Sequence, residues 1–248
     1  MDPLLISAAS GMKSRMESLD MLANNVSNSG TAGFKSDREF YNLYVSQEAV
    51  DATDEWRPDP TTSPVVERHW TDFGQGTLLS TGNALDLAIA GKGFFVVDTA
   101  NGPLYTRNGN FRLSPKGQVI TQDGQTVRVL RPDGEPATLD TTAAINVDAK
   151  GVIHQNGQAV ATLVTAEMED NAKLMKQGST YFRIDGPNPK LSISGEVHQG
   201  TLESSNVPVA EAAVKLVNVM RQFEMLQRAA SIGNDMNKQL IDQVAKVS

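Results

Sequence analysis

The chain has 248 residues, of which 40% are hydrophobic and 21% charged, and it carries a formal net charge of −7 with a pI of about 5.0. This length and composition allow one or two domains with a real core and exclude generic disorder, and the negative charge argues against a nucleic-acid-binding surface. The absence of cysteine excludes disulfides, thiolate metal sites and cysteine nucleophiles.

The first predicted element is a long helix over residues 2 to about 26. Asp2 can cap the free N–H groups of the first turn, and Pro3 suits the first helical position, where its missing N–H costs nothing. A heptad seam is expected to be buried against other helices. Apolar residues with alternating spacings of four and three form such a seam at Leu5, Ala9, Met12, Met16, Leu19, Ala23 and Val26.

A turn-rich link over residues 27–36 follows this helix. Asn24, Asn25, Asn28, Gly30 and Gly33 end the helical pattern. Residues 37–50 show no clean period and could be helical or extended. Residues 51–64 are acidic and rich in proline and threonine, which indicates an extended or mobile loop.

From residue 65 the apolar pattern changes to a period of two. Turn-forming dipeptides such as Asn108-Gly109 and Asp123-Gly124 become frequent. Short strands joined by tight turns predict an antiparallel β domain rather than a βαβ sheet. The predicted strands are residues 65–70, 77–80, 85–90, 93–98, 104–107, 111–113, 118–121, 126–130, 145–147, 152–154, 159–166, 181–184 and 196–202.

One tetrapeptide occurs twice, at the two ends of this β region. Gln75-Gly76-Thr77-Leu78 recurs as Gln199-Gly200-Thr201-Leu202. We interpret the two copies as the strands through which the chain enters and leaves the β domain, lying side by side. The alternative is chance identity.

The last predicted element is a second long amphipathic helix, which follows Pro208 and runs to about residue 245. At 1.5 Å per residue it would reach on the order of 55 Å, too long for a small β domain to cover. It therefore needs a partner, either other copies of the chain or the first helix of the same chain in a closed hairpin. Its apolar stripe is Ala212, Leu216, Val219, Phe223, Leu226, Ala230, Gly233, Asn237, Leu240 and Val244.

Together these elements predict an α+β fold. The long N- and C-terminal helices are expected to form a coiled-coil-like stalk, with a central antiparallel all-β domain. The expected boundaries are 1–36 for the first helix and link, 37–70 for an extended or mobile segment, 71–202 for the β-rich domain, and 203–248 for the last helix.

No set of residues converges on a catalytic, cofactor or metal site. His69, His154 and His198 lack a His, Asp or Glu partner at metal-ligand spacing on a shared helix. The Gly91-Lys92-Gly93 run lacks the upstream glycine and following Ser or Thr of a phosphate loop. We therefore expect no enzyme, no cofactor and no metal. We also expect no cleavable signal peptide and no membrane span.

Four motifs span nearly the whole chain. They are the Asn-rich helix end with Gly33-Phe34-Lys35, residues 85–97, residues 105–111 and residues 199–207. In sequence and order they resemble the signatures of the bacterial flagellar axial proteins, the family of rod and hook proteins. Chain length and residues 221–225 (Arg-Gln-Phe-Glu-Met) are most similar to the proximal-rod members, with the distal-rod members close.

The resemblance implies a structural subunit of the flagellar basal-body rod. In this family the terminal helices pair into an inner tube that transmits torque and encloses the export channel, and the β domains face outward. The implied partners are copies of the chain, other proximal and distal rod proteins, and the flagellar type III export apparatus. The implied location is the periplasmic rod, reached without a cleaved signal.

The predicted interface residues follow from the helical stripes and the Asn cluster. The Asn side chains could hydrogen-bond between subunits or could simply end the helix. The alternatives for function are a distal-rod protein, a secreted fibre or adhesin-like protein, and an enzyme. The interface set is Leu5, Met12, Met16, Leu19, Asn24, Asn25, Asn28, Leu216, Val219, Phe223, Leu226 and Leu240.

Overall fold

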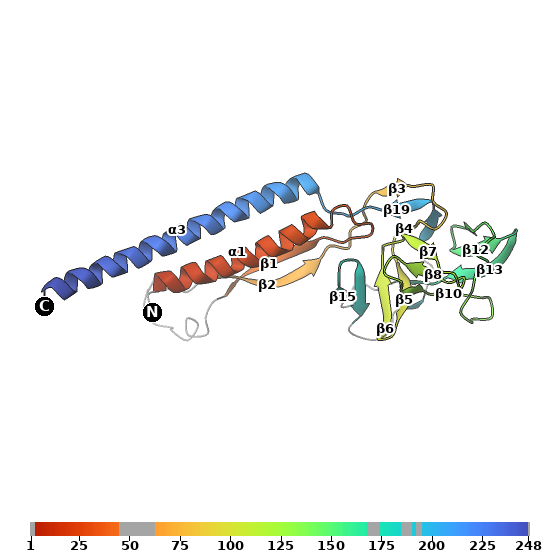
Figure 1. Ribbon diagram of the computed structural model, residues 1–248, viewed down its shortest axis with the longest axis horizontal. Helices are drawn as coiled ribbons and strands as arrows, with labels where there is room; N and C mark the ends of the chain where they lie inside the picture. Colours follow the sequence, from red (N-terminus) through yellow and green to blue (C-terminus); the bar gives the residue numbers. More distant parts are fainter. Residues whose placement is uncertain (1–2, 45–62, 168–173, 185–189, 192–194, 248) are drawn as a thin grey trace. The chain divides into compact units, whose positions relative to one another are not determined.

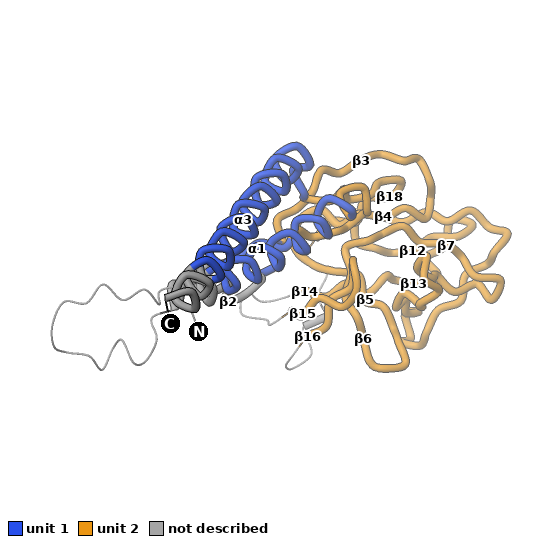
Figure 2. Tube along the Cα trace, turned by 60° about the vertical axis from the view of Figure 1, so that its left-hand side comes forward, with its two compact units in different colours: residues 1–27, 37–72, 207–248 blue, residues 28–36, 73–206 orange. Residues whose placement is uncertain are grey.

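The structure, a computed structural model, describes residues 3–44, 63–167, 174–184, 190–191 and 195–247 (Figure 1). The chain divides into two units (Figure 2). Unit 1 contains residues 1–27, 37–72 and 207–248, and unit 2 contains residues 28–36 and 73–206. The chain therefore passes between the units four times.

Unit 1 contains both helices that occur in the described residues. They are α1 (Pro3–Ser27) and α3 (Val209–Val247), which lie side by side. The bounds of both helices agree closely with those predicted from the apolar spacing. A Cβ added at Gly11 would meet Leu226 Cδ1 at 3.3 Å, so α1 and α3 approach each other closely at this point.

An antiparallel ribbon completes unit 1. Its strands are β1 (Asp37–Tyr44) and β2 (Ser63–Thr71), and both pack against α1. Arg38 forms an ion pair with Asp72 at 2.7 Å and lies over the Trp70 ring. Of the loop predicted over residues 51–64, residues 51–62 lie outside the described residues, and the last two belong to β2.

The prediction of a coiled-coil-like stalk is wrong. A coiled coil would bury the heptad seam of α1, but Ala9, Met16 and Ala23 of that seam are exposed. Because α1 packs against both α3 and the ribbon, its small and polar residues face inward, where neighbouring backbones come close. The residues of α1 that are buried are Ala8, Ser14, Ser18, Leu22 and Asn25.

Unit 2 is built from short antiparallel strands, as the spacing of turns and apolar residues predicted. Together with unit 1 they give an α+β fold. The strands are β3 (Leu78–Ser80), β4 (Leu87–Ala90), β5 (Phe94–Thr99), β6 (Gly102–Thr106), β7 (Phe111–Leu113), β8 (Val119–Thr121), β9 (Thr126–Val127), β10 (Val129–Leu130), β11 (Asn146–Val147), β12 (Val152–Gln155), β13 (Gln158–Leu163), β14 (Thr165–Glu167), β15 (Leu174–Gln177), β16 (Tyr181–Ile184), β17 (Lys190–Leu191), β18 (Glu196–Gln199) and β19 (Thr201–Glu203).

These strands form a nine-stranded sheet, a four-stranded sheet and two small ribbons. The nine-stranded sheet runs β15-β16-β6-β5-β9-β8-β7, with β14 paired to β5 and β17 paired to β14. The four-stranded sheet runs β10-β13-β12-β11. The ribbons are β4 with β18 and β3 with β19.

The central strand β5 is buried on both faces. Phe95 belongs to one hydrophobic core, with Phe111 and Leu163, and Phe94 belongs to a second core, with Phe182. This double burial explains the unbroken apolar run of residues 94–97.

The repeated tetrapeptide marks two paired strands, as predicted. In the β3–β19 ribbon, Leu79 lies opposite Leu202 and Ser80 lies opposite Thr201. The chain thus enters and leaves the β region along neighbouring strands.

Candidate functional site

One face of α3 packs toward α1. Ala212 is buried, and the next six members of the predicted stripe are half-buried: Leu216, Val219, Phe223, Leu226, Ala230 and Gly233. The described interface candidates Leu216, Val219, Phe223 and Leu226 therefore share one face of α3 within the chain. The side chain of Leu240, also a candidate, lies outside those described.

The interface candidates on α1 do not share one environment. Met12 and Leu19 are half-buried, while Met16 is exposed. The side chain of Leu5 lies outside those described. The contacts that these residues were predicted to make with other subunits remain predictions.

A second apolar row lies on the other side of α3 and was missed in the sequence. Val214 is 62% exposed, and Met225, Ile232 and Met236 are each 60% exposed. The steps between them are 11, 7 and 4 residues, which return to one side of a helix at about 100° per residue. Val214 lies two positions after Ala212, so this outer row faces away from α1. Counting helical spacings among the remaining apolar residues of the last helix would have revealed this row in the sequence.

The predicted Asn cluster divides between buried and exposed positions. Asn25 is buried, and its amide pairs with the main chain of Asp37 in both directions. Nδ2 donates to the Asp37 carbonyl at 2.8 Å, and Oδ1 accepts from the Asp37 N–H at 3.0 Å. Asn25 thus ties the end of α1 to the start of β1, while Asn24 is exposed and Asn28 half-buried. Their hydrogen bonding between subunits stays a prediction.

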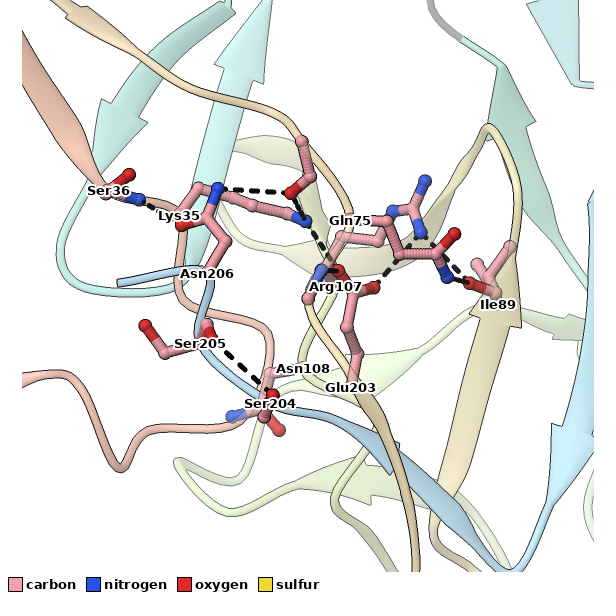
Figure 3. A network of polar contacts seen from close by, with 12 residues as sticks. Lys35, Ser36, Gln75, Ile89, Arg107, Asn108, Glu203, Ser204, Ser205 and Asn206 are labelled. Atoms are coloured by element: carbon pink, nitrogen blue, oxygen red, sulfur yellow. Dashed lines mark hydrogen bonds and ion pairs between the residues drawn. The ribbon is translucent and has the colours of Figure 1, made fainter. Parts of the chain in front are cut away.

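A buried charge cluster in unit 2 brings together three residues from distant parts of the chain. Lys35 Nζ donates to Glu203 Oε1 at 2.5 Å, and Arg107 donates to Glu203 Oε2 at 3.1 Å. Lys35 and Glu203 are each 1% exposed, and Arg107 is 6% exposed. Figure 3 shows the three side chains converging. Each lies in one of the sequence motifs identified above, but sequence spacing alone gave no sign that they meet.

The cluster also forms hydrogen bonds with the main chain. Lys35 donates to the Gly74 carbonyl at 2.8 Å, and Arg107 donates to the carbonyls of Ile89 at 3.1 Å and Gly91 at 2.6 Å. The Gly76 N–H donates to Glu203 Oε1 at 2.9 Å. These bonds join residues 35, 74–76, 89–91, 107 and 203 into one network (Figure 3).

Burial acts strongly on Arg107. Desolvation lowers the pKa of its guanidinium, and the neighbouring Glu203 carboxylate opposes this shift through its charge and hydrogen bond. The guanidinium also lies over the Phe94 ring, 5.2 Å from its centroid. Hydrogen bonds hold the charged groups of the cluster in place, and the single Glu203 carboxylate pairs with both Lys35 and Arg107.

The link next to Lys35 is packed against the same region of unit 2. Phe34 is fully buried, and Lys176 lies 4.1 Å from the centroid of its ring while donating to the Lys35 carbonyl. Gly33 has a φ of +69°, and a Cβ there would overlap the main chain of Arg107. The Gly33-Phe34-Lys35 motif therefore combines a close backbone approach, a core ring and a buried ion.

The described residues contain no group of three His, Asp or Glu side chains able to hold a metal ion. His154 lies 3.6 Å from Asp148, and His198 lies 3.9 Å from Glu196, both partly exposed pairs. The His69 side chain lies outside those described. Neither of the two described helices combines the length and apolar character needed to cross a membrane.

Two family models match the chain. Residues 88–159 match the flagellar hook protein FlgE/F/G D1 domain, and residues 198–243 match the C-terminal region of the flagellar basal body rod FlgEFG proteins. Arg107 lies within the first match and Glu203 within the second.

Three relatives cover most of the chain. The flagellar basal-body rod protein FlgF of Caulobacter vibrioides is 28% identical over 100% of both chains, and FlgF of Rhizobium meliloti is 32% identical over 83% of both. The flagellar basal-body rod protein FlgG of Bacillus subtilis is 29% identical over 96% of this chain and 97% of its own length.

Proposed function

The chain belongs to the family of flagellar basal-body rod proteins, and we propose that it builds the proximal rod by polymerising through its two terminal helices. It is a structural subunit of the flagellar rod and belongs to the basal body. Its partners in the rod are further copies of the chain and other rod proteins. The subunit performs no catalysis.

The outer row of α3 carries this proposal. Val214, Met225, Ile232 and Met236 place four large apolar side chains in water along one side of a helix whose other side packs against α1. Burying such a side chain stabilises an interface by roughly 1.5–3 kcal/mol. Large apolar side chains aligned on one exposed face of a helix favour a protein–protein contact there.

The exposed seam residues of α1 offer a second surface. Ala9, Met16 and Ala23 recur every seven residues and are exposed. They present small side chains on either side of one methionine, whereas the outer row of α3 presents only large ones. The two surfaces differ, so a contact between them would be heterologous and would extend from subunit to subunit instead of closing as a dimer.

The helices pair within one chain, as the closed-hairpin alternative expected, but this pairing uses only one face of α3. The outer row remains open to other subunits. Polymerisation and pairing within the chain are therefore compatible.

The two FlgF relatives, one matched over the full length of both chains and the other 32% identical, support a proximal position. We further propose export by the flagellar type III apparatus without cleavage of a signal peptide, followed by assembly in the periplasm. Export that depends on this apparatus would also separate the rod protein from a secreted fibre or adhesin-like protein.

The substitution Ile232→Glu tests the outer row. It places a charge within the row, between Met225 and Met236, and the matched control Gln227→Glu adds the same charge on another exposed side of α3. Each variant is expressed in a strain that lacks the wild-type protein. We expect Ile232→Glu to be exported and folded but absent from isolated basal bodies, with no swimming zone in soft agar, while the control swims. Normal swimming by Ile232→Glu would refute the proposal.

A further inference from the structure

The buried charge cluster lies close in sequence to three of the four points where the chain crosses between the units. Lys35 is one residue from the crossing at 36–37, Gly74 is one residue from the crossing at 72–73, and Glu203 is three residues from the crossing at 206–207. All three residues belong to unit 2, so the cluster joins the unit-2 ends of the three connecting segments.

We propose that Lys35, Glu203 and Arg107 form a clamp that locks these connecting segments to one another. In this proposal they are positioning residues, and they fix the path of the chain within unit 2 at residues close in sequence to three crossings. The proposal goes beyond polymerisation, because the clamp lies within one chain and uses none of the exposed rows.

The two carboxylate oxygens of Glu203 accept hydrogen bonds from different parts of the chain. Oε1 accepts from Lys35 of the first connecting segment and from the Gly76 N–H of the second. Oε2 accepts from Arg107, which in turn donates to the main chain of Ile89 and Gly91. One carboxylate thus links the third segment to both others and to the sheet region.

Further bonds run between the same segments. The Gly33 N–H donates to the Glu203 carbonyl at 2.7 Å. Asn206 Oδ1 accepts from the Ser36 N–H at 2.8 Å, and its Nδ2 donates to the Gly74 carbonyl at 3.1 Å. The side chains of Glu203 and Asn206 therefore both bridge residues 33–36 and 74–76.

The charges make Glu203 the central residue. Two buried cations share its single carboxylate, so its loss would remove a negative charge from beside both of them in a buried site, which is unfavourable. The exposed pair Arg128–Asp98 provides the contrast, because water can replace either partner there.

Hydrogen exchange of the full-length protein tests the clamp. The variant Glu203→Gln keeps the shape of the side chain but removes its charge, and Asp98→Asn makes the same change in the exposed pair. We expect amide exchange at Gly33, Ser36 and Gly76 to become at least about tenfold faster in Glu203→Gln, with β5 and β6 unchanged. Asp98→Asn should change none of these three amides.

Two results would overturn the proposal. Unchanged exchange at the three amides would show that the cluster does not hold the segments. Equal acceleration in β5 and β6 would show a general stabilising role instead of a local lock.

A second variant covers the case in which Glu203→Gln does not fold. Lys35→Met removes one cation and leaves Glu203 paired one-to-one with Arg107. We expect faster exchange at Gly33 and Ser36 but not at Gly76, whose N–H keeps its bond to Glu203. Full protection of residues 33–36 in Lys35→Met would contradict the clamp.

Discussion

Gly33 stands where two stretches of main chain come into contact. It adopts a φ of +69°, and any Cβ there would overlap the main chain of Arg107. The next two residues, Phe34 and Lys35, are buried in unit 2. A sequence motif that could have been a simple turn is therefore a tightly fitted part of the β unit, and glycine is required at its first position.

The substitution Gly33→Ala should destabilise the protein. The left-handed conformation alone costs of order 1–3 kcal/mol for a residue with a side chain, and the overlap with Arg107 adds to this. Urea denaturation measures the free energy of unfolding. Gly30→Ala is the control, because a Cβ there has open space within 4 Å. We expect its unfolding free energy to stay within about 1 kcal/mol of wild type.

The sequence of α3 predicts which face of the helix is less exposed, but it does not predict which element packs against that face. The apolar stripe of α3 was predicted from the heptad spacing, and its members Ala212, Leu216 and Val219 lie on the less exposed side of the helix. The apolar seam of α1 was also apparent in the sequence. In the structure α1 packs against the ribbon as well as against α3, so the residues that it buries differ from those of the seam. Apolar periodicity identifies the face of a helix that is suited to burial, but it does not identify the element that covers this face.

The neighbouring residues Leu226 and Met225 lie on different faces of α3, so substituting each of them tests one face. Leu226→Ala removes a half-buried side chain next to Gly11, so we expect a loss of roughly 1–2 kcal/mol in the unfolding free energy of unit 1, below the usual cost at a fully buried site. Met225→Ala should leave the stability of the monomer unchanged and reduce the recovery of subunits in basal bodies.

Denaturation of the purified monomer, combined with counting of subunits in isolated rods, checks both variants. Loss of monomer stability in Met225→Ala would contradict the assignment of that residue to an outer surface.

For the molecule as a whole, local sequence patterns predicted most strands and the pairing of the repeated tetrapeptide, because both follow from turns and alternation. The charge cluster could not be predicted this way. Lys35 and Glu203 are separated by 168 positions, and no periodicity connects residues that meet only through tertiary folding. The β1–β2 ribbon was similarly hidden, since the segment containing β1 has no clean apolar period.

The two units should unfold separately. Unit 2 has two clusters of large buried side chains, centred on Phe95 and Phe94, whereas α1 in unit 1 buries mainly small or polar residues. Calorimetry of the monomer should therefore show two transitions, with unit 1 unfolding at the lower temperature. Leu226→Ala should move only the lower transition. A single transition that shifts as a whole would show that the units unfold together.

The order of the three clamp charges along the polypeptide has a consequence for biosynthesis. Lys35 and Arg107 leave the ribosome first, and the carboxylate that neutralises them comes almost one hundred positions after Arg107. Until Glu203 emerges, burying either cation is unfavourable. In a nascent chain, the link that contains Lys35 therefore cannot be stably buried until Glu203 has been synthesised.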